Sequence, residues 1–184
     1  MKLSVLIPTL DHRRFLLEPF LSYCAPFKDV EVLLDARSKE TPTGTKRNDL
    51  MDSASGDYFI YKDDDDQVSE DYLPEILKAI EQNPDVITFE GEMTTNGAHK
   101  IDWVIKLGEK YEARTDHGSL KYFRFPNHLC AMKRELVKDV RFPDEWLGED
   151  YAWAKKIKDL DLLKTEVHIE KKLYFYHFVS NKRY

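Results

Sequence analysis

The sequence lacks the features of several common protein classes. Only two of its 184 residues are cysteines, and neither belongs to a CxxC or cysteine–histidine pattern, which excludes the usual zinc sites. No apolar run is long enough for a membrane span or a signal peptide, because the run from Leu3 to Leu10 is broken by Pro8. The formal net charge of −6 provides no global field that would attract nucleic acid or anionic lipid. We therefore expect a soluble, reduced, cytoplasmic protein.

The sequence does contain enough apolar material for one folded domain. Hydrophobic residues make up 42% and aromatic residues 12% of the chain. Charged residues reach 34% but are mixed in sign, so intrinsic disorder is not expected. No repeat, low-complexity tract or linker interrupts the sequence. We therefore expect residues 1–184 to form a single domain, with residues 1–90 and 91–184 as its two functional halves.

Short apolar segments alternate with segments of helical periodicity. Buried strands are predicted at 3–7, 30–34, 58–61 and 86–89, and helices at 13–23, at 43–55 and from an N-cap at Ser69 to Ile80. This alternation predicts an α/β fold with a mostly parallel central sheet and helices on both faces. In the second half, Asn96-Gly97 predicts a hairpin, 128–132, 163–169 and 173–178 predict strands, and 149–160 predicts a helix. No elements are assigned between 98 and 127.

Four consecutive aspartates, Asp63 to Asp66, follow the strand that ends at Tyr61. Asp35 follows the preceding strand, and the carboxyl ends of parallel strands meet at one edge of a sheet, where ligands bind. Carboxylates at positions i and i+2 of an extended loop lie on one side of it, and Mg²⁺ and Mn²⁺ prefer such oxygens. The run therefore predicts a site for a divalent cation and a diphosphate. The alternative is a solvated turn leading into the next helix.

Other acidic motifs match the sequence less well. An EF-hand loop that began at Asp63 would need glycine where Val68 stands and glutamate where Pro74 stands. Phosphatases with an aspartate nucleophile usually have their acidic pair after the first strand. Enzymes that activate sugars by nucleotidyl transfer usually have a glycine-rich loop there, whereas the segment from Pro8 to Asp11 contains no glycine.

Several segments, in order, resemble the family 2 glycosyltransferases, which share the GT-A fold. The resemblance rests on five motifs. The first three are the opening strand Ser4–Thr9, Asp35 with Ser38, and the stretch from Gly44 through Arg47-Asn48 to Ala54–Tyr58. The other two are the segment Tyr61–Asp66, and Phe142-Pro143 followed by Gly148-Glu149-Asp150. It touches both ends of the chain and thins between about residues 91 and 127. Ala36-Arg37 departs from the family's usual acid-glycine after the aspartate. The resemblance implies the GT-A version of the α/β fold, with a small antiparallel subsheet on the acceptor side.

The resemblance also implies roles for individual residues. A nucleotide-sugar pocket would be lined by Pro8, Thr9, Asp35, Arg47, Asp63 and Asp64. Mn²⁺ or Mg²⁺ would be held by Asp65 with Asp63, and by a late histidine, His177. The Glu149-Asp150 pair would be catalytic, with Asp150 as the general base. Each residue also has a structural alternative, namely a strand-end turn for Asp35, a solvated helix charge for Arg47, a helix N-terminus for the acidic pair and core packing for His177.

The expected function is therefore metal-dependent, inverting transfer of a hexosyl group from a nucleotide-diphosphate sugar, a UDP-sugar, to an acceptor hydroxyl. The acceptor stays open between a saccharide, a lipid-linked glycan, a protein and a modified base in DNA. Acceptor recognition is expected from residues 91–147. Within this range Trp146 and His128, and beyond it Trp153, could present flat faces to a sugar ring or belong to the core. The alternatives are a sugar nucleotidyltransferase and a non-catalytic relative that binds nucleotide or metal.

Overall fold

The computed structural model describes residues 1–179 and has a mixed α/β architecture. The strands are β1 (Leu3–Pro8), β2 (Val30–Asp35), β3 (Tyr58–Tyr61), β4 (Gln67–Val68), β5 (Val86–Thr95), β6 (Ala98–Ile105), β7 (Glu112–Asp116), β8 (Ser119–Arg124), β9 (Ala131–Lys133) and β10 (Glu166–Phe178). The helices are the 3-10 helix η1 (Asp11–Leu17), α1 (Glu18–Cys24), α2 (Thr43–Ser53), α3 (Tyr72–Ile80), α4 (Arg134–Val137) and α5 (Glu149–Asp159). None of the described helices is long and apolar enough to cross a membrane.

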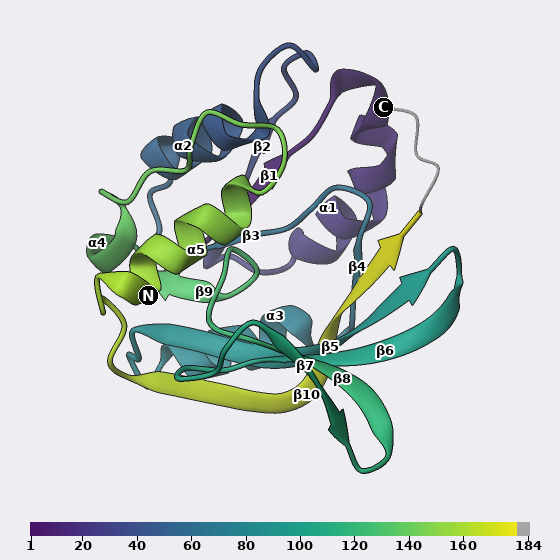
Figure 1. Ribbon diagram of the computed structural model, residues 1–184. Helices are drawn as coiled ribbons and strands as arrows, with labels where there is room; N and C mark the ends of the chain where they lie inside the picture. Colours follow the sequence, from purple (N-terminus) through teal and green to yellow (C-terminus); the bar gives the residue numbers. More distant parts are fainter. Residues whose placement is uncertain (180–184) are drawn as a thin grey trace.

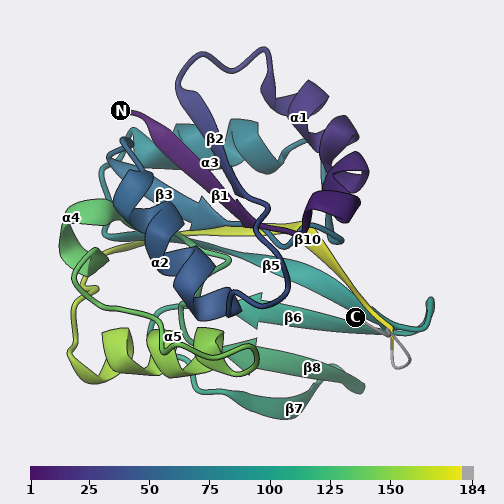
Figure 2. The ribbon, with the colours of Figure 1, turned by 90° about the horizontal axis from the view of Figure 1, so that it is seen from above.

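Within residues 1–179 the strands form one ten-stranded sheet in the order β2-β1-β3-β9-β5-β6-β8-β7, with β10 beside β5 and β4 beside β10. Strands β1, β2 and β3 are parallel to one another, and β10 is parallel to β5. Helices α1 and α3 lie on one side of this sheet and α2 and α5 on the other (Figures 1 and 2). The predicted fold class is thus confirmed.

The burial of each strand follows from its place in the sheet. Every residue of β1 and β3 is buried, because both strands are central and covered on two faces. Strand β2 is only half-buried, so the prediction that it is a buried strand was wrong; it lies at the end of the sheet order. The two late strands predicted from the sequence are one strand, β10, whose pairing with β5 shifts register between Ile169 and Tyr174.

The second half of the chain extends the sheet with both kinds of pair, since β5–β6 and β7–β8 are antiparallel, whereas β6–β8 and β5–β10 are parallel. The predicted hairpin is present between β5 and β6, and both turn residues have positive φ, 50° at Asn96 and 74° at Gly97, as a tight hairpin requires. Strands β6, β7 and β8 occupy the segment that sequence patterns left unassigned. They are continuous with the central sheet and curve away from it (Figure 1), so the predicted acceptor-side strands are an extension of that sheet.

Two local expectations were wrong. Ser69 does not cap α3, which begins at Tyr72, and its buried hydroxyl has no hydrogen-bond partner among residues 1–179. The helix predicted over 43–55 already ends at Ser53, as α2. Gly56, beyond its end, lies so close to β1 that an added Cβ would be 2.6 Å from the Ser4 Oγ. The close approach of these two segments therefore explains the glycine.

Candidate active site

The four aspartates that follow β3 alternate in their exposure. Asp63 and Asp65 keep 34% and 22% of their side-chain surface exposed, whereas Asp64 keeps 7% and Asp66 is buried. The segment is not extended, because Asp64 and Asp65 form a turn in which the backbone N–H of Asp66 donates a 3.3 Å hydrogen bond to the carbonyl of Asp63. Two carboxylates thus face outward at positions i and i+2, and the other two are held inside.

Asp64 anchors the acidic segment to the end of β1. One of its oxygens accepts a hydrogen bond of 2.6 Å from the Thr9 hydroxyl. Its other oxygen lies 2.8 Å from Nη2 of Arg13, and the same nitrogen lies 2.8 Å from Oδ2 of Asp65. Thr9 itself follows β1, next to the carboxyl end of β2, since Pro8 pairs with Asp35 in the sheet. The expected meeting of these strand ends is therefore confirmed.

Asp66 is held on the other side of the segment by β10. It accepts a hydrogen bond of 2.9 Å from the Tyr174 hydroxyl and one of 3.4 Å from the backbone N–H of His177. Burial and the nearby charge of Asp63 raise the pKa of Asp66 to about 7. The buried ammonium of Lys62 donates to the backbone carbonyls of Asp63 and Asp66, at 2.9 and 2.8 Å. These contacts fix the path of the backbone through the acidic run.

Arg47 joins the acidic segment to the start of α5. Its guanidinium is buried and lies 2.9 Å from Oδ1 of Asp63 and 3.2 Å from Oε1 of Glu149. Burial would lower the pKa of Arg47, but the two carboxylates raise it. Burial would conversely raise the pKa of Asp63, and the Arg47 charge together with His128 holds it well below its usual range. For Glu149 burial prevails over Arg47, and its pKa is raised.

His128 lies between the acidic run and Asp150. Its Nε2 is 3.6 Å from Oδ2 of Asp63, and its Nδ1 is 3.6 Å from Oδ2 of Asp150. The ring is buried, and neither nitrogen has a hydrogen-bond partner within the described residues. The backbone carbonyl of His128 accepts a 3.0 Å hydrogen bond from the Tyr61 N–H, at the end of β3. The two acidic features of the sequence therefore share one site, bridged by this histidine.

The first turn of α5 presents Glu149 and Asp150 differently. Gly148, the N-cap, has φ 81°, a conformation that glycine adopts without strain. The side chain of Glu149 is 6% exposed and faces Arg47, whereas that of Asp150 is 36% exposed. A helix N-terminus stabilises both negative charges. Of the two predicted catalytic residues, Asp150 is thus the one that an acceptor could reach.

Asp35 is engaged by the arginine that departs from the family's usual sequence. The Arg37 Nε lies 3.0 Å from both carboxylate oxygens of Asp35, and the Arg37 backbone N–H donates to one of them at 3.1 Å. Burial opposes ionisation here, but Arg37 lowers the pKa of Asp35. The buried Lys46 connects this loop to the site, since it donates 2.7 Å hydrogen bonds to the backbone carbonyls of Thr9 and Arg37.

The structure does not gather His177 with the predicted metal-binding aspartates. Its Nδ1 lies 2.9 Å from the Thr94 hydroxyl on β5, and its backbone N–H donates to Asp66. Residues 1–179 contain no group of three or more histidine, cysteine or acidic side chains placed to hold an ion. Trp153 belongs to the core, stacked on Phe142 at 4.5 Å, so of its two alternatives the structure shows core packing.

Sequence reasoning missed Arg13, Lys46, Lys62 and Tyr174 as parts of this site. A lysine that follows a fully buried strand, as Lys62 does, is a weak signal, because buried lysines are rare without partners. Nothing in the sequence indicates that Arg13 or Tyr174 would reach the acidic run. Their contacts span 52 and 108 residues and depend on the folded topology.

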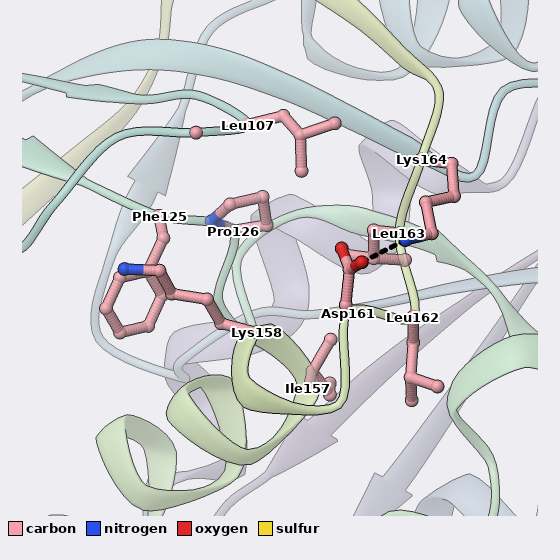
Figure 3. A pocket seen from close by; sticks show the side chains of 10 residues that line it. Leu107, Phe125, Pro126, Ile157, Lys158, Asp161, Leu162, Leu163 and Lys164 are labelled. Atoms are coloured by element: carbon pink, nitrogen blue, oxygen red, sulfur yellow. Dashed lines mark hydrogen bonds and ion pairs between the residues drawn. The ribbon is translucent and has the colours of Figure 1, made fainter.

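A separate pocket lies at the other end of α5. It has a volume of about 400 Å³ and is lined mainly by apolar side chains, among them Leu107, Phe125, Pro126, Ile157 and Leu163 (Figure 3). An ion pair between Asp161 and Lys164 stands at this pocket. Because Ile157 lies two turns along α5 from Glu149 and Asp150, the pocket is distinct from the acidic cluster.

Comparison with known proteins identifies the family. The family model for Glycosyl transferase family 2 matches residues 16–141, about two thirds of the chain. The chain belongs to glycosyltransferase family 2. The match includes α1, α2, the four aspartates and His128. Thr9, Arg13 and the Glu149-Asp150 pair lie outside the matched range. No curated protein matches the chain.

Solved structures confirm the GT-A fold of this family member. S. aureus TarS 1-349 in complex with UDP has a TM-score of 0.65 at 17% identity, covering 96% of this chain and 60% of TarS. The TarS complex with UDP-GlcNAc has a TM-score of 0.64 at 17% identity, covering 100% of this chain and 59% of TarS. A197 from STIV has a TM-score of 0.53 at 14% identity, covering 92% of this chain and 82% of A197. The chain thus spans about 60% of the length of TarS 1-349 and 37% of the longer TarS chain.

Proposed function

We propose that this chain transfers a hexosyl group from a UDP-sugar to an acceptor hydroxyl, with inversion, in a reaction that needs Mn²⁺ or Mg²⁺. The observation on which the proposal rests is the placement of Asp63 and Asp150 on either side of His128, each 3.6 Å from its ring. A carboxylate pair for the donor and a carboxylate for the acceptor therefore stand at one site. Membership of glycosyltransferase family 2 and the UDP and UDP-GlcNAc complexes of TarS support the choice of donor.

The donor side would be formed by the strand ends. Pro8, Thr9 and Asp35 stand together at the ends of β1 and β2, where α/β sheets bind ligands. In this proposal Asp35 accepts a hydrogen bond from the base or ribose. Arg47 would keep Asp63 ionised and in place, since it is buried against that carboxylate.

The outward pair Asp63 and Asp65 suits a hard divalent cation. Both are carboxylates, both are partly exposed, and they are two positions apart in the same turn. Since the described residues add no third side-chain ligand, water and the diphosphate of the donor would fill the other positions. A cation held there would neutralise charge on the leaving diphosphate.

Asp150 would act as the general base. Its carboxylate would take the proton of the acceptor hydroxyl while the hydroxyl oxygen bonds to the anomeric carbon and the bond to the diphosphate breaks, which releases UDP and inverts that carbon. Glu149 would support the reaction by holding Arg47, because it is buried against the guanidinium. His128 would keep the base and the donor carboxylates at a fixed separation.

The test is UDP release from a panel of UDP-sugars with Mn²⁺ and candidate acceptors. We expect Asp150→Asn to bind UDP normally but to lose transfer by about 10²–10⁴-fold, as removal of a general base does. The matched control is Asp159→Asn at the other end of α5, an exposed residue paired with Lys155, which should transfer at the normal rate. Normal transfer by Asp150→Asn would refute the assignment of the base, and release of pyrophosphate in place of UDP would indicate a nucleotidyltransferase.

A further inference from the structure

An arginine from a neighbouring element faces the predicted cation site. Arg13 lies on η1, just after β1, and a single nitrogen of its guanidinium contacts Asp64 and Asp65, at 2.8 Å each. Its side chain is 18% exposed, whereas that of Arg14 is 59% exposed and pairs only loosely with Asp11, at 3.7 Å. Arg13 is therefore built into the acidic segment, and its neighbour is not.

The position of Arg13 conflicts with a cation at Asp65. The guanidinium lies against Oδ2 of Asp65, an oxygen that a divalent cation would also use. A guanidinium stays charged at every physiological pH, so it cannot avoid repulsion by losing its proton. Asp64 cannot move aside with it, because the other oxygen of Asp64 is fixed by the Thr9 hydroxyl at 2.6 Å. The arginine and the cation therefore compete for the same carboxylate.

We infer that Arg13 is a counter-ion that keeps Asp65 occupied until the donor binds. It weakens cation binding to the donor-free protein, and the donor's diphosphate then offers the guanidinium another anion and frees Asp65. Cation and nucleotide consequently bind with positive coupling, which must be reciprocal. This inference rests on the proposed function for the identity of the two ligands.

The experiment is calorimetric titration of Mn²⁺ into the full chain, without and with saturating UDP. We expect Arg13→Gln to bind Mn²⁺ without UDP at least about 5-fold more tightly than the unmodified protein, the lower end of typical coupling factors. The strengthening of Mn²⁺ binding by UDP should shrink correspondingly. Arg14→Gln is the matched control, and it should bind Mn²⁺ as the unmodified protein does in both conditions.

A second variant separates charge from loss of fold. Arg13→Lys keeps the positive charge but lacks the planar fork, so it should bind Mn²⁺ more weakly than Arg13→Gln, and circular dichroism should show that both are folded. Equal or weaker Mn²⁺ binding by Arg13→Gln without UDP would overturn the inference, as would a lack of Mn²⁺ binding by every variant. Should UDP not bind, the proposed donor would be wrong, while the UDP-free titrations would still decide whether Arg13 competes with the cation.

Discussion

Replacement of Arg47 by methionine probes the charge pairing beneath the site. Methionine removes the guanidinium but keeps a long apolar side chain, so little space is left empty. Arg47 is buried and lies between Asp63 and Glu149, at 2.9 and 3.2 Å. Its removal leaves two carboxylates facing a site without their cation. The charge of Glu149 is destabilised more than that of Asp63, because the Asp63 carboxylate still has solvent contact and His128 beside it.

The expected loss of stability is about 3–5 kcal/mol at pH 8, the usual result of breaking a buried ion pair from one side. The free energy of unfolding of a whole domain is about 5–15 kcal/mol, so this loss is a large fraction of the total stability. Burial already raises the pKa of Glu149, opposed by Arg47, and without Arg47 it rises further. The penalty is therefore fully present when Glu149 is ionised and shrinks as the pH falls and Glu149 binds a proton.

The assay is urea denaturation at pH 8 and pH 5, with the double variant Arg47→Met/Glu149→Gln beside the single one. The double variant should recover part of the loss, and the single variant should lose less at pH 5. Arg141→Met is the matched control, since its half-exposed guanidinium pairs with the exposed Asp52 at the surface; it should change stability by less than about 1 kcal/mol. A loss below about 1 kcal/mol for Arg47→Met at pH 8 would refute the reasoning.

Two further predictions concern the donor site and the first sheet. Asp65→Ala should weaken UDP binding only when Mn²⁺ or Mg²⁺ is present, as calorimetry would show, whereas equal weakening without metal would indicate a structural role for Asp65. Glu31 on β2 is partly desolvated, which raises its pKa, but hydrogen bonds from Ser4 and Ser55 lower it to about 2. The stability that ionised Glu31 contributes is therefore present above its unfolded pKa and is lost as the pH falls toward 2. Between pH 5 and pH 2, the free energy of unfolding of Glu31→Gln should fall by about 2–3 kcal/mol less than that of the unmodified protein. Identical pH slopes in urea denaturation would contradict this.

The parts of the fold that could be predicted from the sequence are those decided by local pattern. Strands β1 and β3 are short apolar runs because both of their faces are covered. The hairpin at Asn96-Gly97 follows from the positive φ that both residues adopt. The placement of the acidic run at the shared edge follows from parallel strand order. Each of these depends only on neighbours in the sequence or on a general rule of sheet topology.

The remaining parts depend on partners distant in the sequence. Strand β2 has an apolar sequence like that of a central strand, and only its place in the sheet order makes it half-exposed. Strands β6 to β8 contain many polar residues because much of their surface is exposed, so their sequence gives a weak strand signal. The contact of Arg13 with the acidic run arises only when η1 folds back over the end of β3.

The central claim is that the outward aspartates and Asp150 flank a single donor site. The most direct test is a crystal structure of the protein with UDP and Mn²⁺, with the metal located by its anomalous signal. We expect the metal at about 2.0–2.4 Å from a carboxylate oxygen of Asp65 or Asp63, with the diphosphate on the side that faces Asp150. Metal and nucleotide bound away from this cluster, for example in the apolar pocket beside Ile157, would contradict the account.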